Sequence, residues 1–383
     1  MPTDRIFYGT VSYGIAGHLV TVRRVHSTGS FRIEGFQHDR RQHATRVRVR
    51  SAILRAGRPE PRGTILLTCP TLPAERWSSA TSLDLPIALA ALDHDEFRVE
   101  KAICIGELDF SGELRAVRAA LPFAQVALRE QLPIICPPGN ASECLLATQH
   151  VWVSRSLTDL LTVGSWAPPL EAYPEPGVHV EDLSLDEVRG SEAAKTALRK
   201  AAHGRKSILL LGPPGSGKTM LARRATTLLP RTVTQTERLA IATVYSTAGL
   251  HKPGPAWRPF RAPHHTASSA ALIGGLRGHL GEASLAHGGV LFLDEITEFA
   301  RAPLESLWPV QRDHCVPILH SDDPLPADFW LIAAADPCSC GWRGAEDIQR
   351  CRCSSNASAS YQRRLDEIKK HFDVVVETES YRP

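Results

Sequence analysis

The sequence predicts two domains, an α+β domain over residues 1–163 and an α/β P-loop domain over residues 180–383. The phosphate-loop motif G-x-x-x-x-G-K-[ST] occurs without a mismatch at residues 212–219, between an apolar segment and a helical one. Before it, strands and helices mix without the strict βαβ alternation of a doubly wound fold. Residues 164–179, which contain four prolines, are typical of a semi-rigid linker between the two.

Composition narrows the class of protein. The chain has 383 residues, too many for one ordinary core, and its 43% apolar and 22% charged residues are typical of a globular protein. It has no apolar run long enough to span a membrane and no secretion signal near Met1, so we expect a cytoplasmic protein without a membrane partner. The nine cysteines are then expected to be reduced. A net charge of +3 is too small to indicate nucleic acid by itself.

Residue patterns predict the main elements. In the first domain we expect a hairpin at 9–25, strands at 31–35, 64–69, 102–108 and 133–136, and helices at 39–57, 83–92, 119–130 and 157–163. In the second domain we expect a helix at 191–203 with Ser191 as its N-cap, followed by strands at 207–211, 289–293, 331–335 and 374–376.

The P-loop predicts a site for ATP with Mg²⁺. Its residues are Gly212, Pro213, Pro214, Gly215, Ser216, Gly217, Lys218 and Thr219. Glycines let several backbone N–H groups point at one anion, and the following helix adds the positive end of its dipole. Lys218 is expected to contact the β- and γ-phosphates and Thr219 to hold Mg²⁺. The alternative is a glycine-rich turn before a helix.

Acidic residues follow two of the buried strands. Asp294 and Glu295 end the strand at 289–293, where Asp294 is expected to bind Mg²⁺ and Glu295 to polarise the attacking water. The alternative is an acidic strand end without a role. Asp336 ends the next strand, and two interpretations stay open: a polar group beside the nucleotide, or an N-cap or turn residue before Pro337.

Three further stretches each allow two interpretations. The pairs Cys338/Cys340 and Cys351/Cys353 could bind Zn²⁺ through four thiolates or remain reduced thiols in a loop. The basic residues between 343 and 370 fit either a nucleic-acid backbone or a solvated helix face. The glycine-rich stretch at 274–281 fits a mobile loop or a surface hairpin, and His264 and His265 before it suggest a structural or phosphate-contacting role.

These motifs together resemble the Mg-chelatase-like AAA+ ATPases of the YifB/ComM family over essentially the whole chain. The matching stretches are 84–89, 106–108, 212–224, 258–266, 281–295 and 337–341. The resemblance implies a Lon-protease-like first domain (ribosomal S5 domain 2-like), an AAA+ core, and assembly into a homo-oligomeric ring, expected to be a hexamer. In ComM-like members it also implies DNA branch migration during recombination of transforming DNA.

A Lon-type peptidase needs a serine and a lysine, and the stretch after Ser82 offers no lysine, so we expect no proteolysis. The sequence departs from the family pattern in three places. Asp336 stands where the family has asparagine. His371 stands where an arginine finger is expected, with Lys370 and Arg364 as substitutes. The helical lid that follows the core in the family would lie beyond Pro383, so we expect this core to lack it.

The resemblance to the family and the departures from its pattern lead to two functional hypotheses. The first is Mg²⁺-dependent ATP hydrolysis that drives a DNA-handling ring, with Glu295 as the catalytic residue. The second is a nucleotide-binding regulatory or structural subunit with little ATP turnover. Intact Lys218, Asp294 and Glu295 favour the first hypothesis, whereas Asp336, His371 and the absent lid favour the second.

Overall fold

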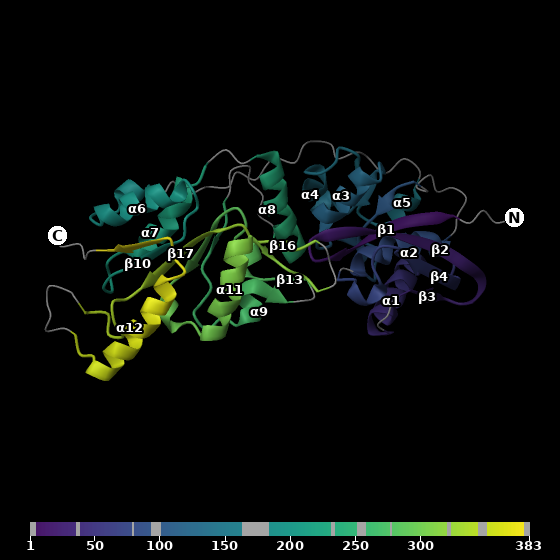
Figure 1. Ribbon diagram of the computed structural model, residues 1–383. Coiled ribbons are helices and arrows are strands. Elements are labelled where there is room, and N and C mark those ends of the chain that lie inside the picture. Colours follow the sequence, from purple (N-terminus) through teal and green to yellow (C-terminus); the bar gives the residue numbers. More distant parts are fainter. Residues whose placement is uncertain are drawn as a thin grey trace. The chain divides into compact units, whose positions relative to one another are not determined.

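The computed structural model describes residues 5–35, 39–78, 80–92, 101–162, 184–230, 234–250, 258–275, 278–319, 323–343 and 351–378. The chain divides into two compact units (Figure 1). The first comprises residues 1–176 with 245–252, and the second 177–244 with 253–383. The predicted linker at 164–179 lies outside the described residues. Within the described ranges, no helix combines the length and the hydropathy that a membrane span requires.

A seven-stranded mixed sheet forms the first unit, in the order β3-β4-β2-β1-β5-β8-β9. The strands are β1 (Ile6–Tyr13), β2 (Ala16–Ser30), β3 (Arg32–Glu34), β4 (Arg62–Thr68), β5 (Ile103–Cys104), β8 (Ile134–Cys136) and β9 (Val151–Val153). β1 and β2 form the antiparallel hairpin that the alternating sequence predicts, and β5, β8 and β9 continue the sheet in parallel. The prediction of a single strand at 102–108 is wrong. Gly106, at φ 151°, separates β5 from β6 (Glu107–Leu108), which pairs with β7 (Leu114–Arg115).

Five α-helices are described in the first unit: α1 (Asp39–Arg55), α2 (Asp84–Leu92), α3 (Ala120–Arg129), α4 (Ala141–Leu145) and α5 (Leu157–Leu161). Short 3₁₀ turns span Ala74–Arg76, Ala80–Leu83 and Pro138–Asn140. Helix α2 is buried along almost its whole length, in keeping with its apolar sequence. Ser82 lies in the turn before α2, fully buried, and its hydroxyl donates to the Thr10 carbonyl.

A five-stranded parallel sheet forms the second unit, in the order β11-β14-β17-β10-β18. The strands are β10 (Ile208–Leu211), β11 (Phe260–Arg261), β14 (Val290–Leu293), β17 (Trp330–Ala335) and β18 (Val374–Glu377). Every residue of β10, β14 and β17 is buried, which explains why these strands are continuous apolar runs. β17 lies between β10 and β14, so the carboxyl ends of all three meet at one edge of the sheet.

The helices of the second unit lie on both sides of this sheet. They are α6 (Glu192–Ala202), α7 (Lys218–Ala225), α8 (Gln235–Ala248, its last turn assigned to the first unit), α9 (Ser269–Ile273), α10 (Glu282–Leu285), α11 (Arg301–Asp313) and α12 (Ser355–Lys369). Leu198 of α6 and Leu221 of α7 pack with Phe292 and Trp330 over one face, and Figure 1 shows α12 on the other. Ser191 occupies the expected N-cap position, but in a left-handed conformation without a side-chain cap hydrogen bond.

Short elements complete the second unit. Two antiparallel pairs join β12 (Gly274–Gly275) to β13 (His279–Leu280) and β15 (Cys315–Val316) to β16 (Leu325–Pro326). 3₁₀ turns span Leu185–Glu187, Thr226–Leu228 and Ile296–Glu298. The glycine-rich stretch at 274–281 therefore forms a hairpin within its described residues, which was one of its two predicted forms.

Candidate nucleotide site

The predicted phosphate loop joins β10 to α7. Gly215 and Gly217 adopt φ values of 79° and 81°, a left-handed conformation in which glycine avoids the strain that other residues would incur. Helix α7 begins at Lys218, directly after Gly217. The strand, the glycine turn and the helix N-terminus thus follow one another in the order that an anion site requires.

The C-terminal strand holds this loop in place. The hydroxyls of Ser216 and Thr378 lie 2.7 Å apart, and the Thr378 hydroxyl donates to the Leu211 carbonyl at 3.0 Å. A Cβ atom added at Gly212 would lie 2.0 Å from the Thr378 hydroxyl oxygen. Gly212 is therefore required by close packing rather than by its backbone conformation.

Lys218 is held at the tip of the loop by three oxygen acceptors. Its Nζ donates to the carbonyls of Gly212 at 2.7 Å and Pro213 at 3.0 Å, and to Asp336 Oδ1 at 3.0 Å. The Lys218 side chain is 10% exposed and that of Asp336 is 32% exposed. The charge-assisted bond to Asp336 was not expected from the sequence.

The two predicted Mg²⁺ ligands are in contact. Thr219 Oγ1 donates to Asp294 Oδ2 at 2.8 Å. A hydroxyl and a carboxylate are hard oxygen donors of the kind that Mg²⁺ takes beside nucleotide phosphates, so these residues fit the expected ion. The contact brings together two residues 75 positions apart in the sequence, both of which were predicted to hold Mg²⁺.

Glu295 follows Asp294 in a left-handed conformation at φ 50°, and its side chain is 63% exposed. His265 Nδ1 lies 3.5 Å from Glu295 Oε2, and the ring centroids of His264 and His265 lie 4.1 Å apart with the planes tilted by 34°. The histidine pair was predicted to have a structural or phosphate-contacting role, without a connection to Glu295. No pattern in the sequence joins positions 265 and 295, since the contact depends on the pairing of β11 with β14.

Asp336 ends β17, and bends and turns rather than a helix follow it, so it is not an N-cap. Two groups of α12 fix the backbone here. Tyr361 Oη donates to the Asp336 carbonyl at 2.9 Å, and Gln362 Nε2 donates to the Pro337 carbonyl at 2.6 Å. Burial raises the pKa of Tyr361 to about 12, which keeps its hydroxyl protonated as a donor.

The four cysteines that follow come together. Their sulfur atoms all lie within 4.8 Å of one another, with Cys338 and Cys340 at 3.4 Å and Cys340 and Cys351 at 3.7 Å. A tetrahedral zinc ion with Zn–S bonds of about 2.3 Å separates its sulfurs by roughly 3.8 Å. Backbone hydrogen bonds, first from Trp342, lower the pKa of the Cys340 thiol to about 6, which favours the metal-binding thiolate. The set, completed by Cys353, fits zinc.

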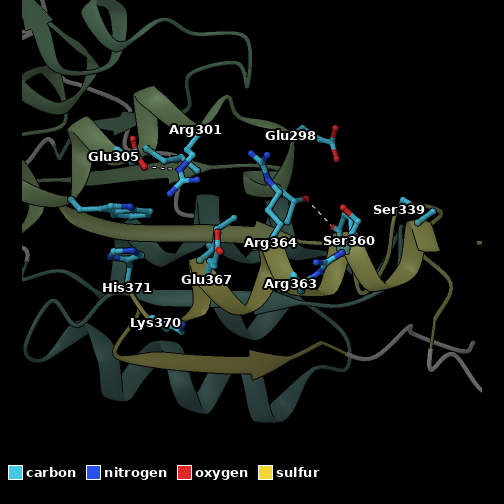
Figure 2. A pocket seen from close by; sticks show the side chains of 16 residues that line it. Glu298, Arg301, Glu305, Ser339, Ser360, Arg363, Arg364, Glu367, Lys370 and His371 are labelled. Atoms are coloured by element: carbon cyan, nitrogen blue, oxygen red, sulfur yellow. Dashed lines mark hydrogen bonds and ion pairs between the residues drawn. The ribbon is translucent and has the colours of Figure 1, made fainter. Parts of the chain in front are cut away.

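A pocket of about 880 Å³ lies between α11, α12 and the turn Ile296–Glu298. Figure 2 shows that its wall includes His371, Lys370 and Arg364, the three residues considered for the arginine-finger position. The His371 ring stacks on Trp308 at 4.3 Å with the planes only 7° apart, and Arg364 donates to the Phe299 carbonyl. The residues that line this pocket include none of the phosphate loop.

The basic stretch is described only in part. Arg343 Nη1 donates to Ser358 Oγ at 2.9 Å, and Lys369 pairs with Asp366 at 3.1 Å on α12. Arg350 lies outside the described residues. The described part of the stretch thus mixes basic and acidic groups on α12.

Two family profiles match the chain. The profile described as "Magnesium chelatase, subunit ChlI" matches residues 184–383, and the one described as "Subunit ChlI of Mg-chelatase" matches residues 20–140. The competence protein ComM of Haemophilus influenzae is 36% identical over 88% of this chain and 69% of its own length. The protein YifB of Escherichia coli is 34% identical over 87% of this chain and 67% of its own length. The chain thus spans about two thirds of these relatives.

Two other similarities are more limited. An archaeal Lon protease of Thermoplasma volcanium is 36% identical over 70 residues, which are 18% of this chain and 11% of that protein. Among solved structures, the Thermotoga maritima RuvB Holliday junction branch migration motor aligns with a TM-score of 0.30 and 21% identity. That alignment covers 52% of this chain and 48% of the RuvB chain.

Proposed function

Because the chain belongs to the YifB/ComM family of magnesium chelatase-like AAA+ proteins, we propose that it binds ATP with Mg²⁺ and hydrolyses it to ADP and phosphate. One observation supports this above all. Lys218, Thr219, Asp294 and Glu295 converge at one edge of the parallel sheet although they come from two separate segments. A phosphate loop, a metal-binding pair and a carboxylate base are the parts that phosphoryl transfer requires.

Each residue of the site has a separate role in this reaction. The N–H groups at the start of α7 and the Lys218 ammonium bind phosphate oxygens and stabilise their negative charge. Thr219 and Asp294 would hold Mg²⁺, whose charge offsets that of the β- and γ-phosphates. The Glu295 carboxylate is exposed next to this pair, where it can accept a proton from an attacking water. His265 Nδ1 lies 3.5 Å from that carboxylate.

We further propose that the protein acts on DNA as a homo-oligomeric ring. Support comes from the family and from the name of the Haemophilus relative, a competence protein, and from the basic residues of the segment 343–370. A ring would let a neighbouring subunit supply the charge that the His371 position does not.

A second function is favoured by a specific observation. Lys218 pairs with a carboxylate, Asp336, and His371, at the position where an arginine finger is expected, stacks on Trp308. A site of this kind suits a regulatory subunit that holds nucleotide with little turnover.

Steady-state ATPase assays with and without DNA distinguish the two. We expect wild-type turnover at least about 10²-fold above that of Glu295→Gln, the range that a general base contributes. Lys218→Ala should lose ATP binding altogether in equilibrium titration. Turnover equal to that of Glu295→Gln under every condition, with ATP binding intact, would leave the regulatory function and exclude the motor.

We also propose that Cys338, Cys340, Cys351 and Cys353 hold a structural Zn²⁺. The convergence of four sulfurs supports it, and the ion would be distinct from the Mg²⁺ beside Thr219.

A further inference from the structure

The Lys218–Asp336 ion pair has a consequence for which nucleotide the site prefers. Lys218 is the cation of the phosphate loop, and its ammonium group already has three acceptors within 3.0 Å, one of them charged. A phosphate-loop lysine serves the β- and γ-phosphates together. The Asp336 carboxylate therefore takes up a position on Lys218 that a terminal phosphate would otherwise occupy.

The neighbours of Asp336 hold its backbone in position beside Lys218. The Asp336 carbonyl accepts a hydrogen bond from Tyr361 Oη at 2.9 Å, which fixes the backbone. Gly341 packs against the carboxylate, because a Cβ atom there would lie 3.1 Å from Asp336 Oδ2 and 2.6 Å from Pro214. Strand β17 places Asp336 beside β10 through a parallel register that pairs Ala335 with Leu211.

The negative charge of Asp336 determines whether a diphosphate or a triphosphate fits beside Lys218. A γ-phosphate adds negative charge within a few ångströms of a second anion, and at that distance repulsion in a partly buried site is substantial. A β-phosphate is bound mainly by the backbone N–H groups of the loop, so its binding depends less on the charge of Lys218. The carboxylate of Asp336 thus weakens the binding of a triphosphate more than that of a diphosphate.

We propose that Asp336 is a specificity residue that makes this site favour a nucleoside diphosphate over a triphosphate. The proposal rests on the proposed function, in that residues 212–219 must bind nucleotide. It applies equally to an ATPase whose turnover is slowed by tightly bound ADP and to a regulatory subunit that senses ADP.

Isothermal titration of the full chain with Mg-ADP and Mg-ATP tests it. Wild type should bind ADP more tightly than ATP. Asp336→Asn keeps the shape of the side chain and removes its charge, so it should lower the Kd for ATP about tenfold or more while changing that for ADP less than about threefold. Asp336→Ser provides a second neutral variant. Asp313→Asn, an exposed position on α11, is the matched control for loss of one acidic charge.

The outcomes separate this proposal from the function it rests on. If both nucleotides bind and Asp336→Asn leaves the ratio of the two Kd values unchanged, the specificity role is wrong and nucleotide binding stands. The same holds if Asp336→Asn weakens ATP binding. If neither wild type nor Asp336→Asn binds either nucleotide, the proposed function fails first. ATP binding gained by Asp336→Asn and Asp336→Ser, and not by Asp313→Asn, supports the proposal.

Discussion

Asp84 brings a carboxylate into the core of the first unit, at the start of the apolar helix α2. Its side chain is fully buried and accepts hydrogen bonds from Arg48 Nε at 2.7 Å, Arg48 Nη2 at 3.1 Å and the Leu108 N–H at 3.2 Å. Burial raises the pKa of Asp84 to about 6, against the opposing effect of the Arg48 guanidinium. Desolvation thus outweighs the ion pair here, as it often does for buried charges.

This shift predicts a pH dependence of stability. The folded pKa of about 6 lies above the unfolded value of 3.8, so the folded chain binds a proton that the unfolded chain releases. The resulting stabilisation is complete below the unfolded pKa and is lost as the pH rises through about 6. From pH 7 to pH 5, protection of the α2 amides against hydrogen exchange should rise by about 1 kcal/mol relative to Asp84→Asn. Equal changes in both proteins would contradict this origin.

Residues of the phosphate site differ in how far sequence predicts them. Lys218, Thr219, Asp294 and Glu295 could be assigned because their chemistry is tied to fixed spacing and to strand ends. The Thr219–Asp294 contact agrees with the prediction that both residues hold Mg²⁺. The Lys218–Asp336 pair was not foreseen, because it requires β17 to lie next to β10, and strand order cannot be read from the sequence. Asp336 was predicted either to lie beside the nucleotide or to be an N-cap or turn residue.

Two pairs of cysteines lie between the end of β17 and the start of α12. Cys338 and Cys340 follow β17, and Cys351 and Cys353 precede Ser354, the N-cap of α12. A metal bound by both pairs would close this loop and hold Tyr361 against Asp336.

Metal removal tests this element. Purified protein should contain one zinc per chain by elemental analysis, and the Cys338→Ser/Cys340→Ser double variant about none. Exchange protection at the start of α12 should fall in the double variant, because the loop loses its closure. A matched variant, Cys69→Ser, changes a cysteine in the first unit and should retain the metal. Full zinc in the double variant, or none in wild type prepared with zinc, would refute the site.

At the scale of elements, sequence was most successful with long periodic segments. Helices at 39–57 and 119–130 and the hairpin at 9–25 appear as α1, α3 and the β1–β2 pair. The short elements β7, β9 and α4 were not predicted, because elements of at most five residues are defined by pairing or packing partners far along the chain rather than by their own pattern. The longer helices α8 and α11, of 14 and 13 residues, were not predicted either.

The proposed ring makes a prediction for the whole molecule. Nucleotide that bridges subunits should promote assembly, so sedimentation velocity should show a larger species with Mg-ATP than without nucleotide. Glu295→Gln should assemble at least as well as wild type because it retains bound ATP. Lys218→Ala should remain at the size seen without nucleotide. One size for all three proteins in every condition would argue against nucleotide-driven assembly.

The sheet order β11-β14-β17-β10-β18 also determines at which point of folding the candidate nucleotide site can form. The contacts that build it join residues 75, 118 and 162 positions apart. Long-range contacts of this kind form late, after the entropy of closing large loops has been overcome. A chain emerging from the ribosome lacks Thr378, and with it the support of the phosphate loop, until nearly all of the described second unit has been made. A chain that binds nucleotide through this loop would therefore have its sheet complete as far as β18.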